Sequence, residues 1–251
     1  MSTDTAGKSS FDLLEVEHPE FVGLVNEQAF DGVADWASPV PPLDRVLAQS
    51  ILLKRLIDLP LAVLCGLVVL PMVAIIALLV KLSSRGPVFF SGKRIGAGGR
   101  HFYAWKFRTM RTDAEQVLEE HLAKCPELRR QWEETQKLKN DPRVTRLGRF
   151  LRKASLDELP QLLNVLKGDM SLVGPRPIVD QEVCRYGDVF KLYCSVLPGI
   201  TGLWQISGRN NTTYEERVGY DATYVRNWSV WLDLSILVRT AKVVLLQEGA
   251  Y

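Results

Sequence analysis

Two adjacent carboxylates, Asp157 and Glu158, are the residues whose types and spacing best suit chemistry on a phosphate group. Two cations, Arg152 and Lys153, precede them. The pair lies at the predicted start of a helix, where the helix dipole and nearby positive charge favour an ionised carboxylate. An ionised Asp157 could attack phosphorus to give an acyl phosphate, and Glu158 could hold a magnesium ion that also binds a diphosphate. A structural interpretation stays open, because Ser155 and Glu158 also have the spacing of a capping box.

Three other segments carry cations that could screen the charge of a phosphate substrate. Arg176 lies between two prolines, in a loop stiff enough to hold its guanidinium in place. Arg209 follows a glycine-containing stretch, residues 198–205, whose glycines permit close approach of the backbone to a ligand. Lys106 and Arg108 alternate with aromatic residues, so we expect them to share one face of a strand. Each of these side chains could equally be a solvated surface residue.

A run of 22 residues without a charge, Leu59–Val80, predicts contact with a membrane, because about 18 apolar residues are enough to mark a membrane segment. Pro71 lies near its middle and removes a backbone donor there, so a bend is expected. Basic residues flank the run on both sides. Two arrangements fit this pattern: a kinked helix that crosses the membrane, and a helix that enters, breaks near Pro71 and returns to the same side.

The remaining segments predict a small amount of sheet and several helices. Two β-prone runs, residues 88–90 and 101–107, enclose a glycine-rich turn and predict a hairpin. Thr112 and Glu115 have the spacing of a capping box that would open a polar helix, interrupted at Pro126. The last apolar stretch, residues 231–246, contains three charged residues, which favours an amphipathic helix at the membrane interface or in the core.

Charge divides the chain into an acidic tail and a basic body. Residues 1–50 contain nine Asp or Glu and two Lys or Arg, and their composition predicts a disordered tail. The other residues carry 29 basic and 20 acidic side chains, a net charge of +9 that suits an anionic lipid surface or a phosphate-bearing substrate. No zinc-ligand spacing or nucleic-acid-binding motif is present, which argues against a nucleic-acid partner. We therefore expect a tail at 1–50, a membrane helix at 51–82 and a catalytic body at 83–251.

Together these features resemble the bacterial sugar transferase family, the monotopic phosphoglycosyl transferases that begin assembly of exopolysaccharide, capsule and O-antigen repeat units. The resemblance covers residues 54–251. The motifs that carry it are, in order, Lys54 and Arg55 with Asp58, Pro71, residues 106–110 (KFRTM), Asp157 with Glu158, residues 166–177 (LKGDMSLVGPRP), residues 198–205 (PGITGLWQ) and residues 208–210 (GRN). One departure is Leu70, where the family commonly has a serine whose hydroxyl can stabilise a bend.

The resemblance implies a covalent mechanism. Asp157 would attack the β-phosphate of a UDP-sugar, UMP would leave, and undecaprenyl phosphate would then take the sugar phosphate from the aspartate. Glu158 would bind Mg²⁺. The cations that it places around the phosphates are Lys106, Arg152 and Arg176, with Arg209 on the nucleotide or sugar side.

For the fold, the resemblance implies an α+β, mainly helical, monotopic membrane protein with a re-entrant helix broken near Pro71, a small β-hairpin and interfacial amphipathic helices. It places the chain on the cytoplasmic face of the bacterial inner membrane, with membrane lipid, UDP-sugar, undecaprenyl phosphate and downstream glycosyltransferases as partners, and it is compatible with a homodimer. Galactose is favoured over glucose as the sugar. The alternative is a catalytically silent membrane scaffold that binds nucleotide sugar, against which the intact carboxylate pair argues.

Overall fold

The computed structural model describes residues 46–135, 138, 141–208 and 212–246. Most of the expected acidic tail, residues 1–45, lies outside these residues, and so does Arg209. Within them the chain is mostly helical with two small sheets, which confirms the predicted mainly helical α+β class.

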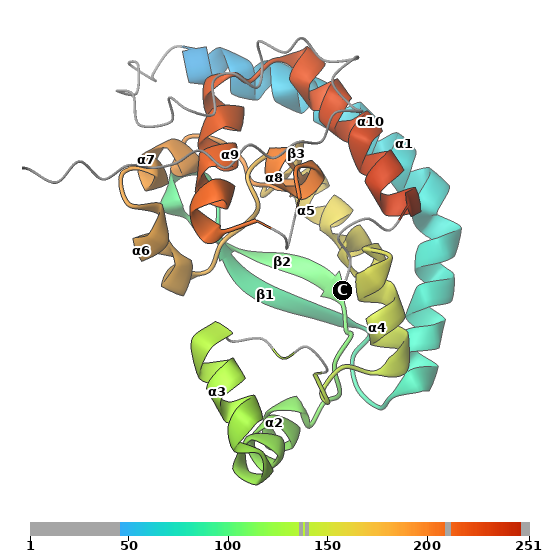
Figure 1. Cartoon of the computed structure of the whole chain (residues 1–251). Helices are drawn as coiled ribbons and strands as arrows, with labels where there is room; N and C mark the ends of the chain where they lie inside the picture. Colours follow the sequence, from blue (N-terminus) through green and yellow to red (C-terminus); the bar gives the residue numbers. More distant parts are fainter. Residues whose placement is uncertain (1–45, 136–137, 139–140, 209–211, 247–251) are drawn as a thin grey trace, which may run out of the picture.

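The apolar run forms part of α1 (Val46–Ser83), a single helix of 38 residues. The helix continues through Pro71, so the expected break at this residue is wrong as an interruption of the helix. A proline removes only its own N–H donor and clashes with one carbonyl of the preceding turn, and a bend can relieve that clash. Figure 1 shows such a bend between the blue half of α1, which lies along the top of the body, and its teal half, which descends beside it.

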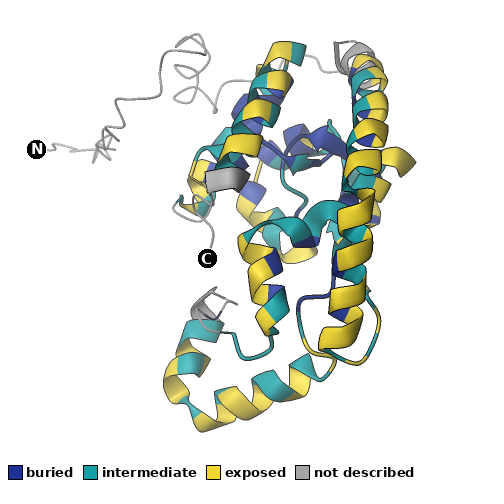
Figure 2. Ribbon diagram, turned by 90° about the vertical axis from the view of Figure 1, so that its right-hand side faces the viewer, coloured by how far each residue is buried: buried dark blue, intermediate teal, exposed yellow. Residues whose placement is uncertain are grey.

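Within α1, the segment Leu52–Ser83 is long and apolar enough to cross a membrane by length and composition. Only 11% of its most apolar window is buried in the protein, unlike the core helix of a soluble domain. Figure 2 shows exposed residues along most of this helix, with the buried residues gathered in the interior of the body. The few buried side chains of α1 include Ala62, Ile76 and Val80, which mark the face that packs against the body.

The predicted hairpin is confirmed: β1 (Phe89–Ile95) pairs antiparallel with β2 (His101–Phe107). Gly98 and Gly99 in the turn have φ of 66° and 72°, left-handed values that glycine adopts without strain. In this register Phe90 lies opposite Lys106, and residues with even numbers share one face of the sheet.

Two apolar clusters hold the elements around the hairpin. The smaller one joins α1, β2 and α4 (Arg146–Lys153) through Ile76, Val80, Phe107 and Leu151. The larger one joins α5 (Leu162–Lys167), α7 (Val189–Cys194), α9 (Tyr214–Arg226) and α10 (Val230–Leu246) around the hairpin and a second sheet. In that sheet β3 (Ser171–Val173) runs parallel to β4 (Gly199–Thr201).

Two polar helices, α2 (Ala114–Lys124) and α3 (Pro126–Thr135), project beyond the hairpin in both views. The expected interruption at Pro126 is confirmed, but the expected capping box of Thr112 is wrong. The N-cap is Asp113, whose carboxylate is held by Arg111 at 2.8 and 2.7 Å instead of capping the helix. The shorter helical elements are η4 (Ala97–Gly99), η5 (Leu156–Gln161), η6 (Asp180–Glu182), α6 (Val183–Tyr186) and α8 (Leu203–Ile206).

Helix α10 contains the last apolar stretch and has two unlike faces. Asp233 is buried, and its carboxylate accepts hydrogen bonds from Lys54, Tyr224 and Trp228. On the outer side Trp231 is 80% exposed, and Val238 is also exposed. The outer side of α10 therefore exposes apolar side chains, while a charged residue lies on its buried side. The expected place of this helix at a membrane interface stays a prediction.

Candidate active site

The two adjacent carboxylates lie in η5, a short 3₁₀ helix that begins after Ser155. Ser155 has φ of 55° and ψ of 19°, a left-handed conformation, and its side chain makes no capping hydrogen bond. The expected capping box of Ser155 and Glu158 is therefore wrong, because Ser155 has a left-handed backbone in place of the extended one that a capping residue usually adopts. Glu158 is therefore not explained as a residue that caps the helix.

The side chain of Glu158 instead meets two cations. Lys106 Nζ lies 2.5 Å from Glu158 Oε1 and 3.9 Å from Asp157 Oδ2. Arg176 Nη2 lies 3.5 Å from the same oxygen of Glu158. The structure thus brings together four of the residues that the sequence singles out, from β2, η5 and the loop after β3.

Arg108 does not belong to this group, contrary to the expectation that it shares a strand face with Lys106. Strand β2 ends at Phe107, and Arg108 lies beyond it, almost fully buried. Its guanidinium donates hydrogen bonds to the carbonyl oxygens of Ser84 at 2.8 Å and Arg85 at 2.9 Å. Arg108 therefore fixes the chain just after α1 to the end of the hairpin.

The loop that carries Arg176 is held by close contact between backbones. A Cβ atom on Gly174 would lie 2.5 Å from the carbonyl oxygen of Leu197, so only glycine fits there. The amide of Gly199 donates to the carbonyl of Pro175 at 2.9 Å. These contacts hold the backbone on both sides of Arg176 in place.

Arg152 approaches the pair from α4. Its Nε donates to Thr109 Oγ1 at 2.9 Å, and burial lowers its pKa while the charges of Asp157 and Asp141 raise it. Helix α4 lies close to the chain after β2, since a Cβ on Gly148 would be 2.1 Å from the Thr109 carbonyl oxygen. Thr109 therefore fixes both the helix and the guanidinium on it.

The electrostatics of Asp157 differ from the sequence-based expectation. Asp157 is 8% exposed, and burial raises the pKa of its carboxyl. Lys106 opposes this rise most strongly, Glu158 adds to it, and Arg152 and Arg176 oppose it. The net direction is upward, because loss of water disfavours the charged form more than the surrounding cations favour it. A carboxylate desolvated in this way is a stronger base and nucleophile when it is ionised.

Arg94, one of the basic residues that follow the membrane segment, is a site residue that the sequence did not reveal. Arg94 lies on the same face of the hairpin as Lys106, and it interacts electrostatically with Arg176, Glu182 and Glu158. Burial lowers the pKa of its guanidinium. The register of the hairpin could have revealed Arg94. Once the turn glycines fix this register, residues 94 and 106 must lie on the same face of the sheet.

The pair of carboxylates offers too few ligands to hold a magnesium ion without a substrate. Among the residues that the structure describes, no group of three His, Cys, Asp or Glu side chains could cage a metal ion. Magnesium, however, is commonly held by one or two carboxylates together with substrate phosphates and water. Asp157 and Glu158 fit an ion of this kind, which enters with a diphosphate, and do not fit a metal held by protein ligands alone.

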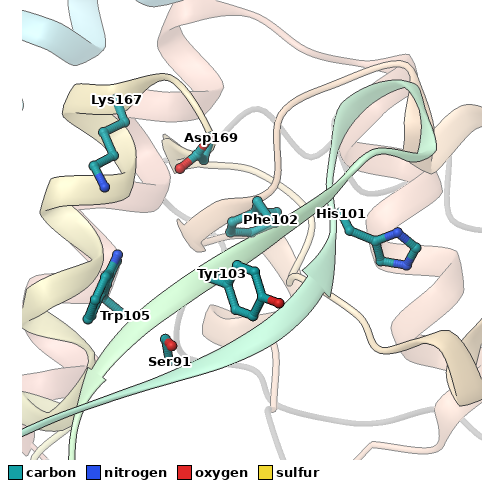
Figure 3. A pocket seen from close by; sticks show the side chains of 7 residues that line it. All are labelled: Ser91, His101, Phe102, Tyr103, Trp105, Lys167 and Asp169. Atoms are coloured by element: carbon teal, nitrogen blue, oxygen red, sulfur yellow. The ribbon is translucent and has the colours of Figure 1, made fainter.

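A separate pocket of about 460 Å³ lies against the hairpin (Figure 3). The residues that line it are Ser91, His101, Phe102, Tyr103, Trp105, Lys167 and Asp169. Trp105 precedes Lys106 in β2 and so points to the opposite face of the strand. The pocket includes neither Asp157 nor Glu158 and is distinct from the candidate active site.

Comparison with known proteins gives one family. The model of the bacterial sugar transferase family matches residues 49–247. The chain is 50% identical over 204 residues to an undecaprenyl-phosphate galactose phosphotransferase of Salmonella typhimurium, which covers 81% of this chain and 42% of that protein. It is 48% identical to the exopolysaccharide production protein ExoY of Rhizobium meliloti, covering 79% of this chain and 88% of ExoY.

A third relative is the UDP-glucose:undecaprenyl-phosphate glucose-1-phosphate transferase of Escherichia coli, 42% identical over 85% of this chain and 45% of that protein. The chain thus spans less than half the length of the Salmonella and Escherichia relatives. It spans most of the length of ExoY.

Proposed function

The chain belongs to the bacterial sugar transferase family, and from this premise we propose that it transfers a hexose 1-phosphate from a UDP-sugar to undecaprenyl phosphate and releases UMP. The observation that carries the proposal is the convergence of Lys106 and Arg176 on the Asp157 and Glu158 pair. The names of relatives, which include a galactose and a glucose phosphotransferase, support the substrate class. We propose galactose before glucose as the sugar.

In the first step a carboxylate oxygen of Asp157 attacks the β-phosphorus of the UDP-sugar. The bond from this phosphorus to the oxygen that bridges it to the α-phosphorus breaks, and UMP leaves with that oxygen. The product is an acyl phosphate between Asp157 and the sugar phosphate. Lys106, Arg152 and Arg176 offset the negative charge that makes attack of one anion on another slow.

In the second step an oxygen of the undecaprenyl phosphate attacks the same phosphorus. The acyl phosphate bond breaks, the carboxylate of Asp157 is restored, and a diphosphate now links sugar and lipid. Splitting the transfer in two lets one site serve a water-soluble donor and a lipid acceptor in turn.

We propose Glu158 as the protein ligand of a magnesium ion. When bound, magnesium neutralises charge on the diphosphate and contributes to orienting it. Without a substrate, Lys106 and Arg176 both contact one oxygen of Glu158. A bound diphosphate could pair with these two cations and leave the Glu158 carboxylate to the metal ion.

We place the chain at the cytoplasmic face of the bacterial inner membrane, with α1 re-entrant, α10 at the interface, and downstream glycosyltransferases or a second copy as partners. The exposed apolar surface of α1 and the outward Trp231 and Val238 on α10 support contact with lipid. The bend in α1 supports the re-entrant path, since both flanks of the helix are basic. In this position the enzyme would begin a repeat unit of exopolysaccharide, capsule or O-antigen.

The test is to incubate purified protein with a panel of UDP-sugars without lipid acceptor and to record the intact mass. We expect one adduct of hexose phosphate, with release of UMP, in the wild type and in the control Asp188→Asn, an exposed aspartate. Asp157→Asn should give no adduct. Transfer to undecaprenyl phosphate without any protein adduct would overturn the covalent step, and binding of UDP-sugar without UMP release would favour a silent scaffold.

A further inference from the structure

Arg217 is a buried cation that lies on α9, outside the carboxylate pair and its direct contacts. Its side chain is 10% exposed and sits between two aromatic rings, with Cζ 4.9 Å from the centroid of Trp204 and 5.1 Å from that of Tyr214. Its Nη1 donates to Glu182 Oε1 at 3.1 Å. Among the described residues its Nε and Nη2 have no hydrogen-bond partner, and Tyr186 and Asp221 also interact electrostatically with its charge.

The stack continues from Arg217 to the active site. Arg176 Cζ lies 5.7 Å from the Trp204 centroid, and Arg176 Nη2 reaches Glu158. At the far end, the exposed Arg185 has its Cζ 4.9 Å from the Tyr214 centroid. We call this series, in spatial order Arg185, Tyr214, Arg217, Trp204 and Arg176, the arginine–aromatic stack.

Helix α9 also holds the backbone beside Arg176. Asp221, one turn after Arg217, is almost fully buried and accepts a hydrogen bond from Tyr186 Oη at 2.7 Å. Burial raises the pKa of the Asp221 carboxyl, and the charge of Arg217 opposes this most strongly. The hydrogen bond from Tyr186, the charge of Arg176 and the backbone amide of Arg176 also lower this pKa. Helix α9 therefore acts on Arg176 in two ways. Asp221 contacts the backbone of Arg176, and Arg217 reaches the side chain of Arg176 by way of the Trp204 ring.

We propose that Arg217 is a positioning residue, which holds the Trp204 ring against Arg176 and so fixes the Arg176 guanidinium beside Glu158. This inference rests on the function proposed above. The planar guanidinium of arginine stacks on aromatic faces, whereas a lysine ammonium keeps the charge without the flat surface. Glu182 and Asp221 offset the charge of Arg217, which leaves the Trp204 ring able to contact the second cation, Arg176.

Because Arg217 acts through Arg176, its effect on turnover should exist only while Arg176 is present. A displacement of a catalytic group by about 1 Å can lower the rate by roughly 100-fold, so a loosened Arg176 should lower kcat by about 10- to 100-fold. A residue that merely supports the fold would lower activity by the same factor whatever stands at position 176.

The experiment compares Arg217→Lys, Arg176→Lys and the double variant by kcat and KM for UMP release. We expect Arg217→Lys to lower kcat at least tenfold with a KM change below about threefold, and the double variant to be no slower than Arg176→Lys alone. The matched control, Arg185→Lys at the exposed end of the stack, should keep kcat within about twofold. Independent, multiplying effects at 176 and 217, or wild-type kcat in Arg217→Lys, would overturn the proposal.

A second measurement needs no turnover: the crystal structures of the wild type and of Arg217→Met. In the variant we expect Trp204 to leave its place and Arg176 Nη2 to move away from Glu158. An unchanged Trp204 and Arg176 would refute the positioning role even if the wild type released no UMP, a result that would itself refute the proposed function.

Discussion

Replacing Lys54 should destabilise the protein, because its buried ion pair with Asp233 joins the membrane helix α1 to the body. Lys54 Nζ in α1 lies 2.5 Å from Asp233 Oδ2 in α10, and the two side chains are 9% and 12% exposed. Lys54 also donates to the Tyr224 hydroxyl at 2.9 Å. Replacing it with methionine preserves length and apolar volume but leaves the Asp233 charge buried without its cation.

The loss of stability in Lys54→Met depends on the hydrogen bonds that Asp233 keeps. Breaking a buried ion pair by removing one partner costs about 3–5 kcal/mol. Tyr224 Oη still donates to Asp233 Oδ1 at 2.8 Å and Trp228 Nε1 to Oδ2 at 3.1 Å, which places Lys54→Met near the lower end, at about 3 kcal/mol. At roughly 2–4 °C per kcal/mol for a chain of this size, the midpoint of thermal unfolding should fall by about 6–12 °C.

The assay is thermal unfolding of the detergent-purified protein, followed by tryptophan fluorescence. Lys93→Met is the matched control, because Lys93 lies 3.6 Å from Asp180 in an exposed pair that should contribute within about 1 kcal/mol. The double variant Lys54→Met/Asp233→Leu should recover most of the loss, since it removes both buried charges. A midpoint of Lys54→Met within 2 °C of the wild type, or a double variant less stable than the single one, would refute this reasoning.

Four further predictions test other parts of the structure. Glu158→Ala should raise the magnesium concentration needed for half-maximal UMP release, and an unchanged requirement would contradict its role as ligand. The pKa of Asp221 is raised to about 6 by burial, from 3.8. The folded state then binds the extra proton between these values, so stability should fall by up to about 3 kcal/mol as pH rises from about 4 to 6, a slope that Asp221→Asn should lose in denaturant titrations. Gly148→Ala should lower stability by about 1–3 kcal/mol in the same titrations, because its Cβ would meet the Thr109 carbonyl oxygen, and a stability equal to wild type would contradict the close approach. Pro71→Leu should straighten α1 and make cysteines placed in residues 1–50 accessible to a membrane-impermeant thiol reagent in intact cells, whereas labelling of the wild-type tail would refute the re-entrant path.

Local pattern was enough to predict the apolar helix, the hairpin and the carboxylate pair with its nearest cations. It failed where the outcome depended on contacts between distant segments. Ser155 has the right spacing for a cap, yet a left-handed turn, which spacing does not encode, removes the cap. Arg108 has the right alternation, but the strand ends one residue too early. Arg217 lies more than 40 residues from Arg176 and meets it only through the Trp204 ring, so no short motif contains both.

The geometry of η5 would let two adjacent carboxylates take the different parts that the proposed reaction gives them. A 3₁₀ helix has three residues per turn, so neighbouring side chains diverge by about 120°. Glu158 takes the close contact with Lys106, whereas the same ammonium stays 3.9 Å from Asp157. Among the described residues, the closest ion pair of the buried Asp157 is thus the looser contact with Lys106. In the proposed reaction, a ligand that takes Glu158 from Lys106 would free that ammonium 3.9 Å from Asp157 Oδ2, close enough to offset the charge of a bound phosphate.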